Sequence, residues 1–263
     1  MGVFEGQVAL ITGGGTGIGA AAARQFCAAG GKVVLMGRRA GPLEAVAAPL
    51  GGLAVPGDAA DAADVRQALA AARSAFGGVD VLLANAGGSA PGSVVDTDDE
   101  SWARAMRVNL DTAFVCARES MPELIARKGS IVIVSSLAGH FAGPHVVGYV
   151  TTKHALIGLT RSLARDYGPQ GVRVNAVSPG WVRTDLADRQ MAALMAKHKL
   201  PDLDAAYALV TRDVPLRRAA SADEVAQAAL FLASSQASMI SGVSLLVDGG
   251  ASAVDLPTLA FTH

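Results

Sequence analysis

Cysteine is scarce in this chain, because the 263 residues include only Cys27 and Cys116. Both lie in apolar segments with helical spacing, which predicts that they fill space in a core rather than form a disulfide framework or a metal site. The five histidines are scattered, with no pair four residues apart and no carboxylate cluster beside them, so we expect no metal. Two isolated thiols suit a reducing compartment, and we therefore expect a cytoplasmic protein.

The sequence also has little net charge and no long hydrophobic run. A formal net charge of −1 indicates no general attraction to nucleic acid or to an anionic membrane. No apolar stretch approaches the roughly 20 residues that a membrane span needs. The first residues enter a predicted strand without the basic and apolar regions of a signal peptide. We therefore expect the partner to be a small molecule, and neither nucleic acid nor a membrane.

Short apolar runs alternate with longer helical patterns along the chain, and their lack of polar alternation predicts strands buried on both faces. The seven predicted strands lie in QVALITG, KVVLMG, GLAVPGD, VDVLLANAG, GSIVIVSS, VRVNAVSPG and SLLVDGG. Such alternation of strand and helix builds parallel sheets covered on both faces. We therefore expect an α/β Rossmann fold with a doubly wound, mostly parallel seven-stranded sheet, and a single domain over residues 1–263.

One segment departs from this rhythm. Residues 184–216 form an insertion rich in Met, Leu and Ala, which predicts short helices. Because the insertion follows the carboxyl end of a predicted strand, where ligands bind in such sheets, we interpret it as a substrate lid. Residues 251–263 are expected to form a C-terminal tail. Between these segments, Ser221 and Glu224 have the spacing of a helix capping box.

A glycine-rich turn, TGGGTGIG from Thr12 to Gly19, follows the first predicted strand and precedes the first predicted helix. Gly13 and Gly17 allow a tight turn and close approach of a ligand, and Gly19 allows the helix to pack closely on the sheet. The exposed N–H groups at such a helix start suit a phosphate. This context indicates a dinucleotide site.

Tyr149 and Lys153 lie one helical turn apart, on the same face of a predicted helix. A phenol normally titrates near pH 10, and a neighbouring cation lowers its pKa. The pair therefore predicts a general acid–base. Ser136, at the end of the fifth predicted strand, can bond a substrate oxygen and stabilise developing charge there. For Ser135 we expect only the commoner turn-capping role.

Five motifs occur in an order that resembles the classical short-chain dehydrogenases/reductases from residue 6 to about residue 250. They are TGGGTGIG at residues 12–19, NAG at 85–87, SS at 135–136, YVTTK at 149–153 and PG at 179–180. The departures are minor: Ala84 stands where a second asparagine is common, and Thr152 where serine or alanine is usual. The resemblance implies reversible hydride transfer between a nicotinamide cofactor and a carbonyl/secondary alcohol pair.

The resemblance also implies roles for four catalytic residues. Tyr149 exchanges the oxygen-bound proton, Ser136 holds that oxygen, and Lys153 bonds the nicotinamide ribose and tunes the tyrosine. Asn109 holds a water of a proton relay. Asparagine is unfavourable inside a helix, so a kink or a bound water at Asn109 would explain its place, whereas the alternative is a side chain that faces solvent. We expect no catalytic role for His140 or His145.

By the same resemblance, Asp58 would bond the adenine beside the Ala59 backbone, although a turn-forming aspartate is an equal alternative. Thr184 would bond the nicotinamide carboxamide or the pyrophosphate. Asn85 lies near the cofactor and ties neighbouring strands together. The full set of expected cofactor contacts is Gly13, Thr16, Gly17, Ile18, Gly19, Arg38, Arg39, Asp58, Ala59, Asn85, Ala86, Gly87, Tyr149, Lys153, Pro179, Gly180, Val182 and Thr184.

The end of the second predicted strand indicates which dinucleotide is used. NAD sites place an acidic residue there for the ribose 2′-hydroxyl, and here the position is Gly37, followed by Arg38 and Arg39. An arginine can form a forked contact with a 2′-phosphate. We therefore predict NADP(H) rather than NAD(H), although Thr16 stands where NADP-preferring relatives often carry a second basic residue.

The substrate is less defined than the cofactor. A 3-oxoacyl thioester reductase and a hydroxysteroid or general alcohol dehydrogenase are both compatible with the sequence. A rival from another class is a catalytically silent dinucleotide sensor, which predicts a broken Tyr/Lys pair, whereas here the pair is intact. The predicted helices at about 98–127 and 149–168 carry more apolar surface than one sheet face covers. We therefore predict a homotetramer, with a dimer as the alternative.

Overall fold

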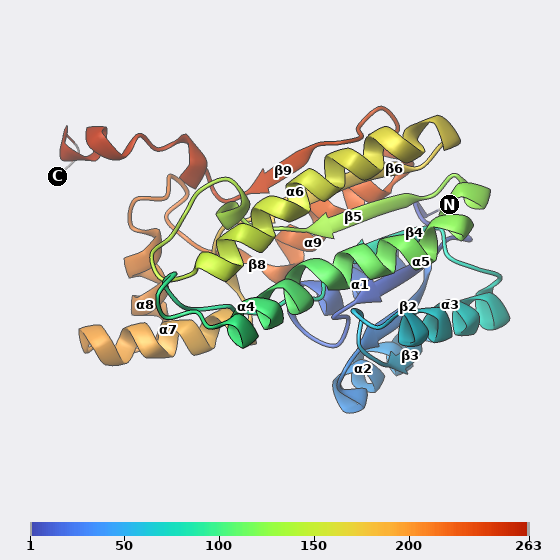
Figure 1. The fold of residues 1–263 in the computed structure, drawn as a ribbon, viewed down its shortest axis with the longest axis horizontal. Helices are drawn as coiled ribbons and strands as arrows, with labels where there is room; N and C mark the ends of the chain where they lie inside the picture. Colours follow the sequence, from blue (N-terminus) through green and yellow to red (C-terminus); the bar gives the residue numbers. More distant parts are fainter. Residues whose placement is uncertain (1, 262–263) are drawn as a thin grey trace.

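Seven parallel strands form the central sheet of the computed structural model, which describes residues 2–261 (Figure 1). They are β1 (Val8–Thr12), β2 (Lys32–Gly37), β3 (Leu53–Pro56), β4 (Val81–Ala84), β5 (Ser130–Val134), β6 (Arg173–Pro179) and β9 (Ser244–Val247). Their order in the sheet is β3-β2-β1-β4-β5-β6-β9, and every pairing is parallel. All seven predicted strands and the doubly wound Rossmann topology are confirmed. The chain reverses direction across the sheet between β1 and β4, which places a ligand crevice at their carboxyl ends.

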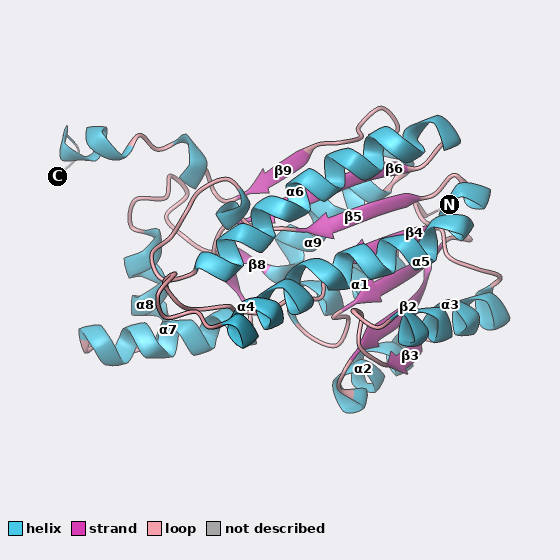
Figure 2. Ribbon diagram, in the orientation of Figure 1, coloured by secondary structure: helices cyan, strands magenta, loops and turns pink. Residues whose placement is uncertain are grey.

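Helices cover both faces of this sheet (Figure 2). The α-helices are α1 (Gly17–Ala28), α2 (Ala40–Ala47), α3 (Ala62–Phe76), α4 (Asp99–Met106), α5 (Thr112–Arg127), α6 (Val147–Tyr167), α7 (Asp185–His198), α8 (Leu203–Thr211) and α9 (Ala222–Ala233). A π-helical turn, η2 (Arg107–Asp111), joins α4 to α5. The short 3₁₀ helices are η1 (Ala48–Leu50), η3 (Leu137–Gly139), η4 (Gly168–Gln170), η5 (Ser235–Ala237), η6 (Ala251–Ala253) and η7 (Leu256–Phe261).

Strand β1 shows why the strand sequences lack polar alternation. Ala9 and Ile11 point to the core beneath α1, α2 and α9, whereas Val8 and Leu10 point to the core beneath α3, α5 and α6. All four residues are at most 2% exposed. Since both faces are covered, apolar side chains are favoured at every position of the strand.

The insertion at residues 184–216 forms α7 and α8, as its composition predicted. The two helices bury a small core of their own, which includes Met191 and Tyr207. A two-stranded sheet closes the base of the insertion, where β7 (Val182–Arg183) pairs with β8 (Ala220–Ser221). The capping box at the start of α9 is confirmed, because the Ser221 hydroxyl accepts from the Glu224 N–H and the Glu224 carboxylate accepts from the Ser221 N–H.

Cys116 is buried as predicted, whereas Cys27 is only half-buried, and both are free thiols. Within residues 2–261, no helix combines the length and apolar character that crossing a bilayer requires. The same part of the chain holds no group of three or more His, Cys, Asp or Glu side chains placed to bind a metal ion.

Candidate active site

The glycine-rich turn after β1 is shaped so that side chains would obstruct it. Gly17 has a φ of 52°, in the left-handed region, and a Cβ there would lie 3.2 Å from Cγ2 of Thr184. A Cβ at Gly19 would lie only 2.5 Å from the Gly13 carbonyl oxygen. Thr16 precedes α1 without a side-chain capping bond, so the first N–H groups of this helix remain available. This is the cradle that a dinucleotide pyrophosphate requires.

Asn85 joins the end of β4 to this cradle. Its amide donates to the carbonyl oxygens of Thr12 at 3.0 Å and Gly13 at 3.3 Å. The Thr12 hydroxyl in turn accepts from the backbone N–H groups of Asn85 and Ala86. Asn85 therefore connects neighbouring strands at the crevice, as the sequence predicted.

The two serines after β5 have different surroundings. Ser135 is buried, and its hydroxyl donates to the Lys153 carbonyl oxygen at 2.9 Å, which fixes α6 against the sheet. Ser136 is half-buried, and its Oγ accepts from the Ala138 N–H at 3.1 Å. Ser136 thus caps η3 through its Oγ, and its hydroxyl also forms a hydrogen bond with Tyr149. Ser135 does not cap the turn, and its role is to anchor a helix.

Lys153 is buried beneath Tyr149 on α6. Lys153 is only 5% exposed, and its Nζ donates to the Val134 carbonyl oxygen at 3.0 Å. Nζ also lies 5.5 Å from the centre of the Tyr149 ring. The spacing in the sequence therefore does place the ammonium beside the tyrosine.

The pKa of Tyr149 shifts upward, whereas the sequence predicted that the neighbouring Lys153 would lower it. Burial raises the pKa of the Tyr149 phenol, and a hydrogen bond with Ser136 only partly opposes this. Burial also lowers the pKa of Lys153 to about 8. Burial is the main cause of both shifts, and at Tyr149 it outweighs the opposing hydrogen bond with Ser136. Tyr149 is therefore a neutral phenol near neutral pH, which suits a proton donor.

The buried ammonium makes a testable contribution to stability. A fall in the pKa of Lys153 from 10.5 to about 8 corresponds to about 3 kcal/mol of destabilisation. Replacing Lys153 by methionine also removes the hydrogen bond to the Val134 carbonyl, and this loss offsets roughly 1 kcal/mol of the stability gained. We therefore expect Lys153→Met to raise the free energy of unfolding at pH 7 by about 2 kcal/mol, measured by urea denaturation.

The stability advantage of Lys153→Met should depend on pH. Because the folded-state pKa lies below the unfolded one, the unfolded state holds more protons between pH 8 and 10.5, and stability rises with pH across that window. The advantage of Lys153→Met should therefore shrink as pH rises from 8 to 10.5. Lys197→Met, at an exposed position on α7, serves as the control and should show no such change. An advantage that stays constant with pH would contradict the assignment.

Asn109 lies in the π-helical turn and is only 1% exposed. Its amide donates to the Ala105 carbonyl oxygen at 3.3 Å, and its Oδ1 accepts from the Gly88 N–H at 3.0 Å. A Cβ at Gly87 would lie 3.1 Å from that Oδ1 and 3.7 Å from Nζ of Lys153. The predicted helix irregularity is confirmed and the solvent-facing alternative is wrong. The Asn109 and Lys153 side chains therefore both approach Gly87.

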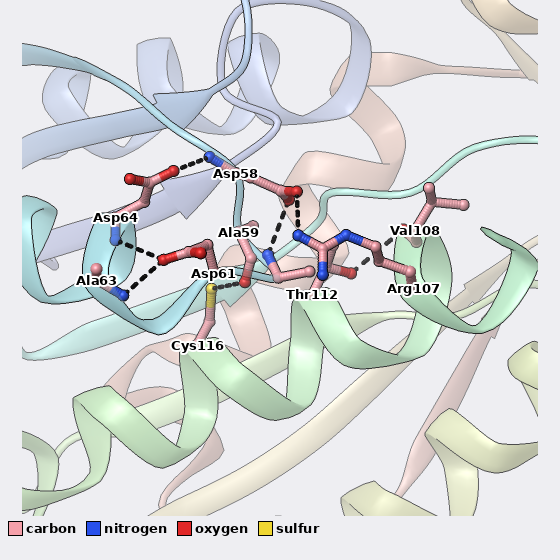
Figure 3. A network of polar contacts seen from close by, with 10 residues as sticks. Asp58, Ala59, Asp61, Ala63, Asp64, Arg107, Val108, Thr112 and Cys116 are labelled. Carbon is pink, nitrogen blue, oxygen red and sulfur yellow. Dashed lines mark hydrogen bonds and ion pairs between the residues drawn. The ribbon is translucent and has the colours of Figure 1, made fainter. Parts of the chain in front are cut away.

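Asp58 is already engaged in this structure (Figure 3). Its Oδ1 accepts from the Ala60 N–H at 2.9 Å, and its Oδ2 accepts from Arg107 at 2.7 Å. Partial burial raises the pKa of Asp58, but the Ala60 and Arg107 hydrogen bonds and the charges of Arg107 and Arg38 lower it overall. Asp58 therefore has the turn-forming role that the sequence offered as an equal alternative to adenine binding. Arg107 was missed from the sequence, where its only signal is a basic residue two positions before Asn109.

The remaining expected cofactor residues lie around the same crevice. Thr184 caps α7 by accepting from the Ala187 N–H at 3.3 Å, next to Gly17. Val182 is 8% exposed and so offers a ligand mainly its backbone. Arg38 and Arg39 are exposed at the end of β2. Ile18, Ala59, Pro179 and Gly180 are half-buried or buried in the turns that border this edge of the sheet.

The two histidines of the loop before α6 differ. Nε2 of His140 lies 3.1 Å from Oγ of Ser244 and 3.3 Å from Oγ of Ser178, which holds η3 to the sheet edge. Burial, followed by the charges of His154 and Arg161, lowers the pKa of His140. His145 is exposed. Neither position provides a reason to revise the expectation that these residues are not catalytic.

Comparisons with known proteins agree on one family. The family model described as "Enoyl-(Acyl carrier protein) reductase" matches residues 13–252. The chain is 50% identical to Protein MoaE of Klebsiella aerogenes over 97% of this chain and 99% of that protein. It is 36% identical to the meso-2,3-butanediol dehydrogenase of Serratia marcescens over 96% of this chain and 97% of that protein. The structure of L-sorbose reductase from Gluconobacter frateurii with NADPH and L-sorbose superimposes with a TM-score of 0.88 at 31% identity, covering 94% and 96% of the two chains.

Proposed function

The chain belongs to the classical short-chain dehydrogenase/reductase family and is an oxidoreductase of alcohol and carbonyl substrates, and from that premise we propose that it transfers a hydride between NADP(H) and an uncharged secondary alcohol or its ketone. The observation that carries the proposal is the meeting of Ser136, Tyr149 and Lys153 at the carboxyl end of β5, beside the glycine-rich turn. The NADPH in the structure of the sorbose reductase supports the cofactor.

In this proposal the nicotinamide supplies or accepts the hydride, and the chain controls the proton. Tyr149 is protonated near neutral pH because burial raises its pKa, so in the reductive direction its phenol donates to the carbonyl oxygen. The Ser136 O–H donates to the same oxygen and stabilises its developing charge. Lys153 and Asn109, which meet at Gly87, return a proton toward Tyr149.

The substrate we propose is a small molecule that carries a hydroxyl group on the carbon adjacent to the reacting carbonyl or alcohol carbon. Two of the relatives support this choice, because one is named for meso-2,3-butanediol and the other was solved with L-sorbose. The description of the matching family model supports an acyl thioester as the alternative, and a hydroxysteroid remains a further alternative.

A panel of substrates tests this proposal directly. NADPH oxidation should be fastest with L-sorbose or the ketone of meso-2,3-butanediol, and slower with an acetoacetyl thioester, a cyclic ketone or a steroid. A thioester that is turned over with the higher kcat/KM would instead establish the thioester reductase. NADPH binding without turnover of any carbonyl would favour the silent sensor.

We also propose that the chain assembles as a homotetramer in the cytoplasm. Trp102 on α4 is 40% exposed and Phe114 on α5 is 46% exposed, so these helices carry apolar surface that the sheet does not cover. Pairing across two-fold axes would remove that surface from water.

A further inference from the structure

The π-helical turn at Arg107–Asp111 contacts both loops that border the ligand crevice. Arg107 bonds Asp58 after β3 at 2.7 Å, and Asn109 accepts from Gly88 after β4 at 3.0 Å. Thr112, just beyond the turn, donates to the Ala86 carbonyl oxygen at 3.3 Å. Figure 3 shows the Arg107 side chain reaching from this turn to the Asp58 carboxylate. The turn therefore places a cation at the end of the crevice nearest β3.

A second cation follows the end of the neighbouring strand. Strands β2 and β3 end side by side, because the Gly57 N–H donates to the Gly37 carbonyl oxygen at 2.9 Å. Arg38 follows the first of these glycines and Asp58 follows the second. The charge of Arg38 lowers the pKa of Asp58, as does that of Arg107. Asp58 therefore attracts both arginines.

Arg38 is proposed to bind the 2′-phosphate of NADP(H), and a negative charge on Asp58 would oppose that role unless another group neutralises it. A free carboxylate beside Arg38 would draw the guanidinium away from a bound 2′-phosphate and would repel that phosphate. The geometry points to Arg107 as a specificity-determining residue for the phosphorylated dinucleotide, since by pairing with Asp58 it cancels this charge and leaves Arg38 free for the phosphate. This inference rests on the proposed NADP(H) function and adds a residue to it.

A purely structural role for Arg107 gives a different expectation. If the ion pair only fixed the loop after β3, its loss would weaken NADPH and NADH alike, because both carry the same adenosine. Loss of charge neutralisation weakens NADPH selectively, because only NADPH carries the 2′-phosphate. The ratio of kcat/KM for NADPH to that for NADH separates the two roles, and it is insensitive to the active fraction of each preparation.

The test compares Arg107→Gln and Arg107→Lys with a control on the preceding helix. We expect the NADPH/NADH ratio to fall about tenfold in Arg107→Gln and to be largely retained in Arg107→Lys. Arg104→Gln, at an exposed arginine whose guanidinium bonds Ser101, should leave the ratio unchanged. An equal loss with both cofactors in Arg107→Gln would overturn the inference.

The same substitution made in an Asp58→Asn variant shows whether Arg107 acts through Asp58. Asp58→Asn removes the charge that Arg107 cancels, so the NADPH/NADH ratio should rise in Asp58→Asn alone. Adding Arg107→Gln to Asp58→Asn should then cost far less of that ratio than it does in the native background. A tenfold fall in both backgrounds would overturn the inference. A preference of the unmodified enzyme for NADH would instead refute the proposed cofactor, before any variant is made.

Discussion

Replacing Tyr149 by phenylalanine should lower turnover by at least about two orders of magnitude, the usual effect of removing an acid–base group. The substitution keeps the ring that lies 5.5 Å from the Lys153 ammonium and removes only the hydroxyl. Cofactor affinity should therefore remain largely intact. Steady-state kcat and the dissociation constant for NADPH, followed by its fluorescence, measure the two effects separately.

A matched control is available on the same helix. Tyr167 ends α6, far along the helix from Tyr149, and Tyr167→Phe should leave turnover near its original value. Since both variants remove one phenolic hydroxyl from one helix, a general effect on folding would appear in both. Near-normal turnover in Tyr149→Phe would end the mechanism proposed here.

The sheet was predictable because the burial of each strand on both faces determines the residue types within that strand. A strand such as β1 is covered on both faces, so its uninterrupted apolar sequence marks it without knowledge of its neighbours. The glycine-rich turn and the Tyr149–Lys153 spacing are also local, because each depends on residues within one or two helical turns. These local features were sufficient to predict the sheet topology and the proximity of Tyr149 and Lys153.

The features that sequence reasoning missed depend on distant contacts. Arg107 and Asp58 are 49 residues apart, and no local pattern pairs them. His140 contacts serines that lie 38 and 104 residues away. The pKa of Tyr149 was expected to fall because the lysine is close in sequence, whereas it rises because the folded chain removes water from around the phenol. Burial and charge pairing across the fold decide each of these cases.

The cofactor preference rests on the end of β2 and can be tested by exchanging its charges. Gly37 has no strained backbone angle, and a Cβ there would meet Leu43 at an ordinary 3.6 Å. Aspartate therefore fits at this position without a clash. Its carboxylate would accept from a ribose 2′-hydroxyl and repel a 2′-phosphate. Replacing Arg38 by leucine at the same time removes the expected phosphate contact.

The double variant Gly37→Asp with Arg38→Leu should shift the NADPH/NADH ratio of kcat/KM toward NADH by about a hundredfold, because two effects of about tenfold each act in the same direction. Ser74→Asp, at an exposed position near the end of α3 and away from the crevice, adds the same charge and should leave the ratio unchanged. The Arg39→Leu variant should cause a smaller shift, since Arg39 lies one residue further from the end of β2. Equal or higher kcat/KM with NADH in the unmodified enzyme would show that the NADP(H) assignment is wrong, because Gly37 and Arg38 would then not select the cofactor.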